Sequence, residues 1–218
     1  MNKPLIEVYN LKKYFPVRRS LSDIIKRRPQ KYLKAVDNIS FNILRGEIFC
    51  LAGESGCGKT TTGRTILRLI EPTAGKILFN GENILKYDED RIKAFRRKAQ
   101  IIFQDPYESV NPRMTIYDIV EEPLRIHKIG NKEERREMVY KMLEEVELKP
   151  PESFLYRFPH ELSGGQRQRV AIARALILNP LFIVADEPVS MLDMSIRAEI
   201  LNLMLSLKDR HNLTYLFI

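Results

Sequence analysis

Cysteine is scarce in this sequence: Cys50 and Cys57 are the only two among 218 residues. So small a number excludes a disulfide scaffold and a four-thiolate zinc site within this chain. No stretch approaches the ~18 uninterrupted apolar residues that a membrane-spanning helix needs, and the first thirty residues contain no apolar core of a secretory signal. Internal repeats, low-complexity tracts and long coiled-coil patterns are also missing. The sequence therefore predicts a soluble globular protein with one large core, or with one core and a subdomain attached to it.

The sequence is moderately basic: 36 Lys and Arg residues and 28 Asp and Glu residues give a net charge of +8. That balance admits nucleic acid, an anionic membrane surface or phosphates as the partner. Most of the excess lies in the segment 16–31, which we interpret as a loop or short helix inserted between two strands. This basic segment either contacts anionic lipid or a partner subunit, or it is simply solvated.

Strand patterns, with alternation or short apolar runs, alternate along the chain with helical patterns. Strands are expected at 5–15, 33–44, 47–52, 76–80, 99–104, 181–186 and 213–218. Helices are expected at 60–70, 88–98, 115–126 and 132–147, the last of them capped by Asn131. Between about 105 and 161 no convincing strand pattern occurs. The sequence therefore predicts a mixed α/β core interrupted by a helical insertion.

The segment GESGCGKT, residues 53–60, matches the pattern Gly, four residues, Gly-Lys-Ser/Thr. Its glycines allow successive backbone N–H groups to wrap around phosphate oxygens, and the following helix points its positive end at the same anion. Lys59 should reach the β- and γ-phosphates, Thr60 should bind Mg²⁺, and Thr61 should hold the α-phosphate. We call residues 53–60 the phosphate loop. The expected nucleotide-binding residues are Gly53, Glu54, Ser55, Gly56, Cys57, Gly58, Lys59, Thr60 and Thr61.

A second motif, LFIVADEP, ends a hydrophobic strand in two acids. Asp186 would orient Mg²⁺ or its waters, and Glu187 could polarise an attacking water as general base. Acids at strand ends are common, so a solvated loop is the alternative for this motif taken alone. Together with the phosphate loop it predicts a metal-dependent nucleotide site.

A third motif, LSGGQ at residues 162–166, continues as RQRVAIARAL. With the two motifs above, the sequence resembles the nucleotide-binding domain of ATP-binding-cassette (ABC) proteins, of which LSGGQ is the signature. Ser163, Gly164 and Gly165 begin a helix and offer a hydroxyl and backbone donors to an anion. The resemblance implies that these residues and Gln166 bind the γ-phosphate of ATP held by the opposite subunit.

Further matches follow in the order of the family. Gln104 resembles the Q-loop glutamine, which senses Mg²⁺ and counts among the catalytic residues with Lys59 and Glu187. Asp193 in SMLD resembles the D-loop aspartate that contacts the partner subunit, although Met191 departs from the usual alanine. Phe15 aligns with the aromatic that stacks on adenine, with Tyr14 as the neighbouring candidate, and either could instead belong to the core.

The resemblance implies an α/β fold: a P-loop NTPase (RecA-like) core with an antiparallel β subdomain and an inserted helical subdomain. It places the core and β subdomain at 1–104 and 162–218 and the helical subdomain at about 105–161, in one domain spanning 1–218. The switch-loop histidine is missing, because His127 lies in the insertion, His160 is interpreted as structural and His211 as a solvated loop residue. We interpret the sequence as truncated at its C-terminus, which puts hydrolysis by this fragment in doubt.

Segments such as NLKKYFPVRR, FQDPYESVNPR and FPHELSGGQRQRVAIARAL resemble the second ATPase subunit of bacterial oligopeptide and dipeptide importers. This implies an ATPase that uses ATP and Mg²⁺ and lies peripherally at the cytoplasmic face of the membrane. Its implied partners are a second ATPase subunit in a head-to-tail ATP sandwich, two transmembrane permease subunits and an extracytoplasmic substrate-binding protein, with no nucleic acid. Nickel and glutathione importers have close relatives and remain alternatives. A soluble ABC ATPase acting on nucleic acid or ribosomes is disfavoured, since neither a coiled coil nor a second cassette is visible.

Overall fold

The computed structural model describes residues 3–19, 29–105 and 110–218, so much of the basic segment 16–31 lies outside the described residues. The backbone divides into two compact units. The first unit comprises Met1–Arg45 and Leu51–Ile92, and the second comprises Gly46–Cys50 and Lys93–Ile218. Within the described ranges, no helix is both long enough and apolar enough to cross a membrane.

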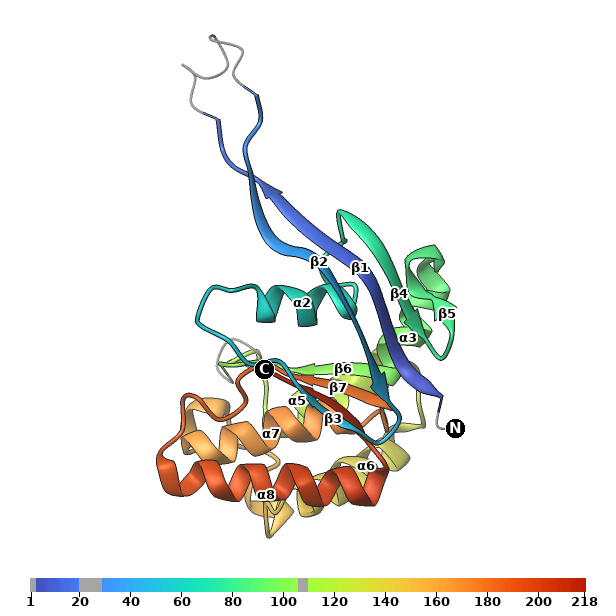
Figure 1. Ribbon diagram of the computed structural model, residues 1–218. Coiled ribbons are helices and arrows are strands. Elements are labelled where there is room, and N and C mark those ends of the chain that lie inside the picture. Colours follow the sequence, from blue (N-terminus) through green and yellow to red (C-terminus); the bar gives the residue numbers. More distant parts are fainter. Residues whose placement is uncertain (1–2, 20–28, 106–109) are drawn as a thin grey trace. The chain divides into compact units, whose positions relative to one another are not determined.

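The first unit is built on an antiparallel sheet with the strand order β2-β1-β4-β5. Its strands are β1 (Pro4–Pro16), β2 (Tyr32–Leu44), β4 (Ala74–Phe79) and β5 (Glu82–Asn83). The long strands β1 and β2 run side by side from the pair Pro4 and Leu44 to the pair Pro16 and Tyr32 (Figure 1). The buried apolar residues of β1 are Leu5, Ile6, Val8 and Leu11, and register shifts in its pairing with β2 interrupt a strict alternation. The strands expected at 5–15, 33–44 and 76–80 are confirmed.

A tight turn adds the strand β5, which the sequence does not predict. Asn80 and Gly81 both have positive φ, 51° and 81°, and they connect the paired residues Phe79 and Glu82. Two central residues with positive φ are typical of a type I′ hairpin turn, which favours Asn-Gly. A strand of two residues is too short to show alternation, so only the turn dipeptide marks it.

Helices complete the first unit. The helix α2 (Lys59–Ile66) follows the phosphate loop, and η1 (Ile84–Lys86) is a single 3-10 turn. The basic helix α3 (Glu89–Lys98) begins in the first unit and ends in the second. Its first turn is acidic and its last turn is basic, which suits the helix dipole at both ends.

The second unit contains a parallel sheet with the order β3-β8-β7-β6. Its strands are β3 (Ile48–Cys50), β6 (Ala99–Ile102), β7 (Phe182–Ala185) and β8 (Thr214–Phe217). Strands from the two ends of the chain are neighbours, since Ile48 pairs with Tyr215 and Cys50 with Phe217. Every residue of β7 is buried, as expected for a parallel strand covered on both faces. The short apolar runs are therefore confirmed as strands, although each strand is shorter than its run and β3 is only partly buried.

Helices make up the remainder of the second unit. They are α5 (Ile116–Ile126), α6 (Lys132–Glu145), α7 (Gly164–Leu176) and α8 (Met194–His211), with the 3-10 turns η2 (Pro151–Ser153) and η3 (Pro159–Glu161). The predicted cap Asn131 is confirmed, because its side chain accepts from the Glu134 N–H and Glu134 reciprocates in a capping box. No strand occurs in the described part of 105–161. The treatment of that segment as a separate subdomain stays a prediction.

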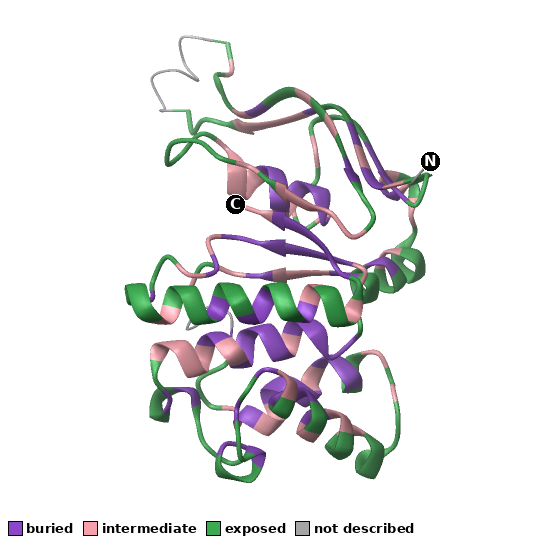
Figure 2. Ribbon diagram, turned by 60° about the horizontal axis from the view of Figure 1, so that its bottom comes forward, coloured by how far each residue is buried: buried purple, intermediate pink, exposed green. Residues whose placement is uncertain are grey.

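One apolar core connects the elements of the second unit. It joins α5 and α6 to the helix α7 and to the strands β6, β7 and β8. Figure 2 shows α7 buried along much of its length, whereas α8 alternates buried and exposed residues. The core thus fixes α7, whose N-terminus carries the signature motif.

One expectation about histidine is wrong. His211 is the last residue of α8 rather than a solvated loop residue, and its Nε2 lies 2.6 Å from Glu145 Oε2. Glu145 ends α6, so this contact joins two helices that are 66 residues apart in sequence. A pairing over that separation leaves no local pattern in the sequence.

Candidate active site

The phosphate loop takes a shape that only glycine allows at one position. Gly58 has φ +96°, and a Cβ placed there would lie 1.9 Å from the carbonyl oxygen of Ala35 in β2. Gly56 also has positive φ, +79°, but open space surrounds its missing Cβ. Glycine is therefore required at position 58 by both dihedral angle and contact, whereas the dihedral angle at position 56 only favours glycine.

Lys59 folds over this loop. Its ammonium donates to the carbonyl oxygens of Gly53 and Glu54, each at 2.8 Å, and lies 3.8 Å from Cys57 Sγ. The positive charge is thus held by carbonyl oxygens that the loop itself provides. Phosphate oxygens are stronger acceptors for an ammonium, so an incoming anion can exchange with these two carbonyls.

The N-terminus of α2 opens from the same loop. Gly58 is its N-cap, and in the described structure no side chain caps this end and no acid occupies the first turn. The positive end of the helix dipole is therefore not neutralised by a carboxylate of the helix. Thr60 and Thr61 lie in this first turn, as the sequence predicts for groups that accompany a phosphate.

The two aromatic candidates for adenine stacking differ in their contacts. The Tyr14 hydroxyl donates to Asp37, and this bond raises the pKa of Tyr14 and lowers that of Asp37. Phe15 is half-buried, and the Lys13 ammonium lies 4.8 Å from the centre of its ring. Phe15 therefore presents an apolar ring without a polar anchor, whereas Tyr14 is tied to β2.

The two acids follow β7 directly in the second unit. Asp186 is almost fully buried, and its N–H donates to the Ile102 carbonyl at the end of β6. Glu187 has φ +46°, a left-handed conformation that costs energy for a side-chain-bearing residue. Its N–H donates to the Ile218 carbonyl, which helps to hold this conformation. The strand end thus turns sharply and keeps one acid inside and the other half-exposed.

Gln104 and Glu187 are joined by a hydrogen bond that no local sequence pattern predicts. Gln104 Nε2 donates to Glu187 Oε2 at 2.7 Å, across a separation of 83 residues. The amide therefore orients the carboxylate that we expect to act as general base. The structure brings these two predicted residues together on adjacent parallel strand ends, β6 and β7.

The signature turn, residues 162–166, forms the capped start of α7. Ser163 is the N-cap, with its Oγ accepting from the Gln166 N–H at 3.3 Å, while Gln166 Oε1 accepts from the Ser163 N–H at 3.0 Å. Such a capping box leaves the serine hydroxyl hydrogen available to another acceptor. The predicted helix start at this position is confirmed.

Asp193 is the N-cap of α8 and is exposed, yet its carboxylate makes no capping hydrogen bond in the described structure. An aspartate at an N-cap ordinarily accepts from the first turn of its helix. The contact of Asp193 with a partner subunit stays a prediction. Met191 is 64% exposed, so its replacement of the usual alanine does not alter core packing.

Sequence reasoning missed Arg197, which lies at the end of the first turn of α8. Its guanidinium donates to the carbonyls of Leu192 and Ser190 beside Asp193. A cation near a helix N-terminus opposes the helix dipole, and that was the one signal in the sequence that could have drawn attention to it.

The donors near these motifs fit Mg²⁺. Within the described ranges no group of three or more His, Cys, Asp or Glu side chains could form a cage of protein ligands. Mg²⁺ is ordinarily held by one or two protein oxygens together with substrate phosphates and waters. The hydroxyl of Thr60 in the first unit is a hard oxygen donor, and so is the buried carboxylate of Asp186 in the second unit.

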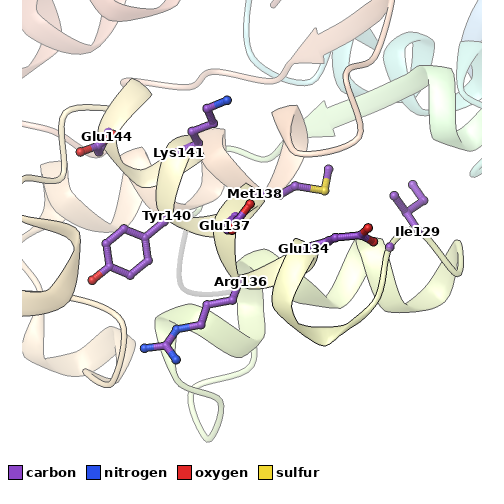
Figure 3. Close-up of a pocket in the computed structure, with 9 residues that line it drawn as sticks. Ile129, Glu134, Arg136, Glu137, Met138, Tyr140, Lys141 and Glu144 are labelled. Carbon is purple, nitrogen blue, oxygen red and sulfur yellow. The ribbon is translucent and has the colours of Figure 1, made fainter.

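A cavity of about 870 Å³ lies on the outer side of α6 and contains none of the predicted site residues (Figure 3). Acidic, basic and apolar side chains are mixed along it. They belong to Ile129, Gly130, Glu134, Arg136, Glu137, Met138, Tyr140, Lys141 and Glu144. This mixture does not complement a nucleotide.

The glycine-shaped loop that opens α2 and the acid-ended parallel strands define an α/β protein of the P-loop nucleotide-binding class. The family model described as "ABC transporter" matches residues 36–190. Similar solved structures include the dimeric ABC transporter cassette MJ0796, with 32% identity, a TM-score of 0.81, and coverage of 97% of this chain and 86% of that chain. A post-hydrolysis state of the same cassette bound to ADP and Pi has 31% identity and the same TM-score of 0.81, with coverage of 97% and 86%.

Among curated proteins, the oligopeptide transport ATP-binding protein AppF of Bacillus subtilis is 50% identical over 215 residues, covering 98% of this chain and 64% of AppF. The dipeptide transport ATP-binding protein DppF of Haemophilus influenzae is 48% identical over 217 residues, covering 100% of this chain and 64% of DppF. This chain belongs to the ABC transporter family. It spans about 64% of the length of these two relatives.

Proposed function

We propose that this protein is the ATP-binding and ATP-hydrolysing subunit of an importer of dipeptides or oligopeptides. The observation that carries the ATP chemistry is the phosphate loop, where Gly58 fits only as glycine and the Lys59 ammonium lies over the loop carbonyls. Peptide import is supported by the sequence identity of 50% and 48%, over nearly the whole chain, to two peptide transport ATP-binding proteins.

The phosphate loop binds the triphosphate of ATP. Lys59 leaves the carbonyls of Gly53 and Glu54 and donates to β- and γ-phosphate oxygens, while the N-terminus of α2 faces the same charge. Thr60 and Asp186 are the residues that would hold Mg²⁺, and Gln104 would sense it. When bound, Mg²⁺ neutralises the negative charge of the β- and γ-phosphates. Phe15 stacks on the adenine ring.

Hydrolysis is the attack of one water on the γ-phosphorus. The bond from that phosphorus to the bridging β–γ oxygen breaks, ADP leaves, and Glu187 accepts a proton from the water. The hydrogen bond from Gln104 orients the carboxylate for this transfer. Catalysis consists mainly of positioning and charge stabilisation around the γ-phosphate.

A second cassette completes the site. Ser163, Gly164, Gly165 and Gln166 of one subunit face the γ-phosphate bound by the other, and Asp193 contacts the opposite subunit. The dimeric structure of the similar cassette MJ0796 supports such a pair. Closure of the pair then drives two permease subunits at the cytoplasmic face of the membrane, to which an extracytoplasmic binding protein delivers the peptide.

The test uses the full-length protein in its host cell. We expect it to co-purify with membrane permease subunits, and we expect uptake of a labelled dipeptide to stop in the Lys59→Ala strain. A matched Lys76→Ala strain, which removes an equal charge from β4, should keep its uptake. Uptake of nickel or glutathione in place of peptide would reassign the substrate. Salt-sensitive nucleic-acid binding without any permease would contradict transport.

A further inference from the structure

The segment that joins Glu187 to α8 is held by its own hydrogen bonds. We call residues 187–193 the D-loop turn. Both the N–H and the Oγ of Ser190 donate to the Glu187 carbonyl, at 3.1 Å and 3.0 Å, and the Leu192 N–H donates to Val189 at 3.2 Å. The turn thus continues without a break from the candidate base to the N-cap Asp193.

Arg197 closes this turn from the side of α8. Its Nε donates to the Leu192 carbonyl at 2.7 Å, and its second terminal nitrogen donates to the Ser190 carbonyl at 3.2 Å. One rigid guanidinium therefore spans two carbonyls of the turn, a geometry that a flexible ammonium reproduces less well. Since a cation at this end of a helix opposes the dipole, helix stability does not explain the placement of Arg197.

The signature turn packs directly against the same segment. A Cβ placed at Gly165 would lie 2.7 Å from Ile196 Cγ2, and one at Gly164 would lie 3.3 Å from Leu192 Cδ2. Leu192 is 7% exposed and lies against Gly164, whereas Ile196 lies against Gly165. Gly165 is thus needed for close contact with the first turn of α8, and Gly164 favours contact with the D-loop turn, in addition to any approach to a phosphate.

We propose that Arg197 is a positioning residue that fixes the D-loop turn against the signature turn, so that both move as one block when two cassettes close on ATP. The inference rests on the proposed function, because it assigns Arg197 a role in pairing. Arg197 holds the carbonyls of Ser190 and Leu192, Leu192 and Ile196 hold the signature glycines, and Ser190 holds Glu187. A displacement of Asp193 by the partner subunit is thereby transmitted to the candidate base and to the signature serine.

The test measures ATP-dependent association of full-length cassettes that carry Glu187→Gln, so that bound ATP persists. Arg197→Gln should weaken this association by about tenfold, because a turn that Arg197 no longer holds must be ordered when the cassettes pair. ATP affinity should stay nearly unchanged, and thermal stability should fall by less than the association does. Arg197→Lys should restore part of it. Lys208→Gln removes the same charge from α8 far along the helix and should have no effect.

Unchanged association of the Arg197→Gln protein would overturn the inference while leaving the proposed function intact. A loss of ATP affinity or thermal stability as large as the loss of association would also overturn it, since Arg197 would then act merely in folding. If the Glu187→Gln protein with Arg197 intact fails to bind ATP, the proposed function and this inference fail together.

A second pair of variants tests the packing. Gly165→Ala should weaken association at least as much as Arg197→Gln, because its methyl group meets Ile196. Gly164→Ala, with more space, should have a smaller effect. Adding Ile196→Ala to Gly165→Ala should restore most of the association. No recovery would show that Gly165 is needed only for the approach of ligand and would overturn the packing step.

Discussion

The phosphate loop of the first unit and the D-loop turn with the signature turn of the second reach their geometry by different means. The loop is fixed by its backbone, since Gly58 at φ +96° sits against the Ala35 carbonyl. The other region depends on side chains, such as Gln104 on Glu187 and Arg197 on Ser190 and Leu192. A side chain at position 58 should therefore disrupt the whole phosphate loop. Loss of one side chain in the other region should reduce its function only in part.

The largest expected effect is on turnover, in the region built from side chains. Glu187→Gln should lower the ATP turnover of the full-length protein by about 10²–10⁴-fold, the usual contribution of a general base, while ATP binding is retained. Glutamine keeps an acceptor for the Gln104 amide, so the local geometry should survive. Steady-state phosphate release and equilibrium nucleotide binding measure the two effects. Glu144→Gln on the exposed side of α6 is the charge control, and wild-type turnover in Glu187→Gln would remove Glu187 as base.

The next largest effect should occur in the region built from backbone. Gly58→Ala should lower the free energy of unfolding by about 2–5 kcal/mol. The energetic cost of a left-handed dihedral angle for alanine adds to the cost of the steric overlap of its Cβ with Ala35. Gly81→Ala has a similar φ, +81°, with open space around the Cβ, so it should cost only about 1 kcal/mol. Denaturant unfolding compares the two variants. Equal losses would show that the contact with Ala35 contributes nothing.

Nucleotide affinity should change next. Lys59→Ala should weaken ATP binding by about 10–100-fold, as expected for a lost charge-assisted contact of 1.5–3 kcal/mol. Lys59→Met keeps the aliphatic stem and should weaken ATP binding equally if the ammonium is responsible. Isothermal titration calorimetry with ATP and Mg²⁺ measures both variants. An unchanged affinity would refute the assignment of the phosphate loop.

A smaller effect should follow from the amide that orients the base. Gln104→Ala should lower turnover by about tenfold, the equivalent of one hydrogen bond to a charged group, and change ATP affinity by less than about twofold. Gln100→Ala, which removes a half-buried glutamine from β6, the strand that precedes Gln104, is the matched control. A loss as large as that of Glu187→Gln would mean that Gln104 does more than orient the carboxylate.

The smallest effect concerns pH. Burial, followed by the charges of Lys93 and Arg97, lowers the pKa of His127 below its usual 6.5. The unfolded chain therefore binds more protons than the folded one just below that pH, and stability falls as the pH drops through about 6.5. His127→Gln should remove this part of the acid sensitivity in thermal unfolding measured between pH 7.5 and pH 5.5. An identical pH profile in the variant would contradict the lowered pKa.

The same comparison explains what could be predicted from the sequence. Caps such as Asn131 and Ser163 and the glycines of the phosphate loop act over a few residues, so their patterns are local and legible. The contact between Gln104 and Glu187 spans 83 residues and that between His211 and Glu145 spans 66, so no local pattern contains them. The strand β5 was missed for the opposite reason, because two residues are too few to form a pattern.

The most direct measurement compares ATP binding with ATP hydrolysis as the full-length protein is diluted a hundredfold. The central claim is that the phosphate loop binds ATP by itself, whereas the signature turn and the D-loop turn act on the ATP of a second cassette. Binding per chain should then stay constant, while hydrolysis per chain should fall in proportion to concentration once pairs dissociate. Hydrolysis per chain that stays constant over the whole dilution, with the protein monomeric, would contradict the claim.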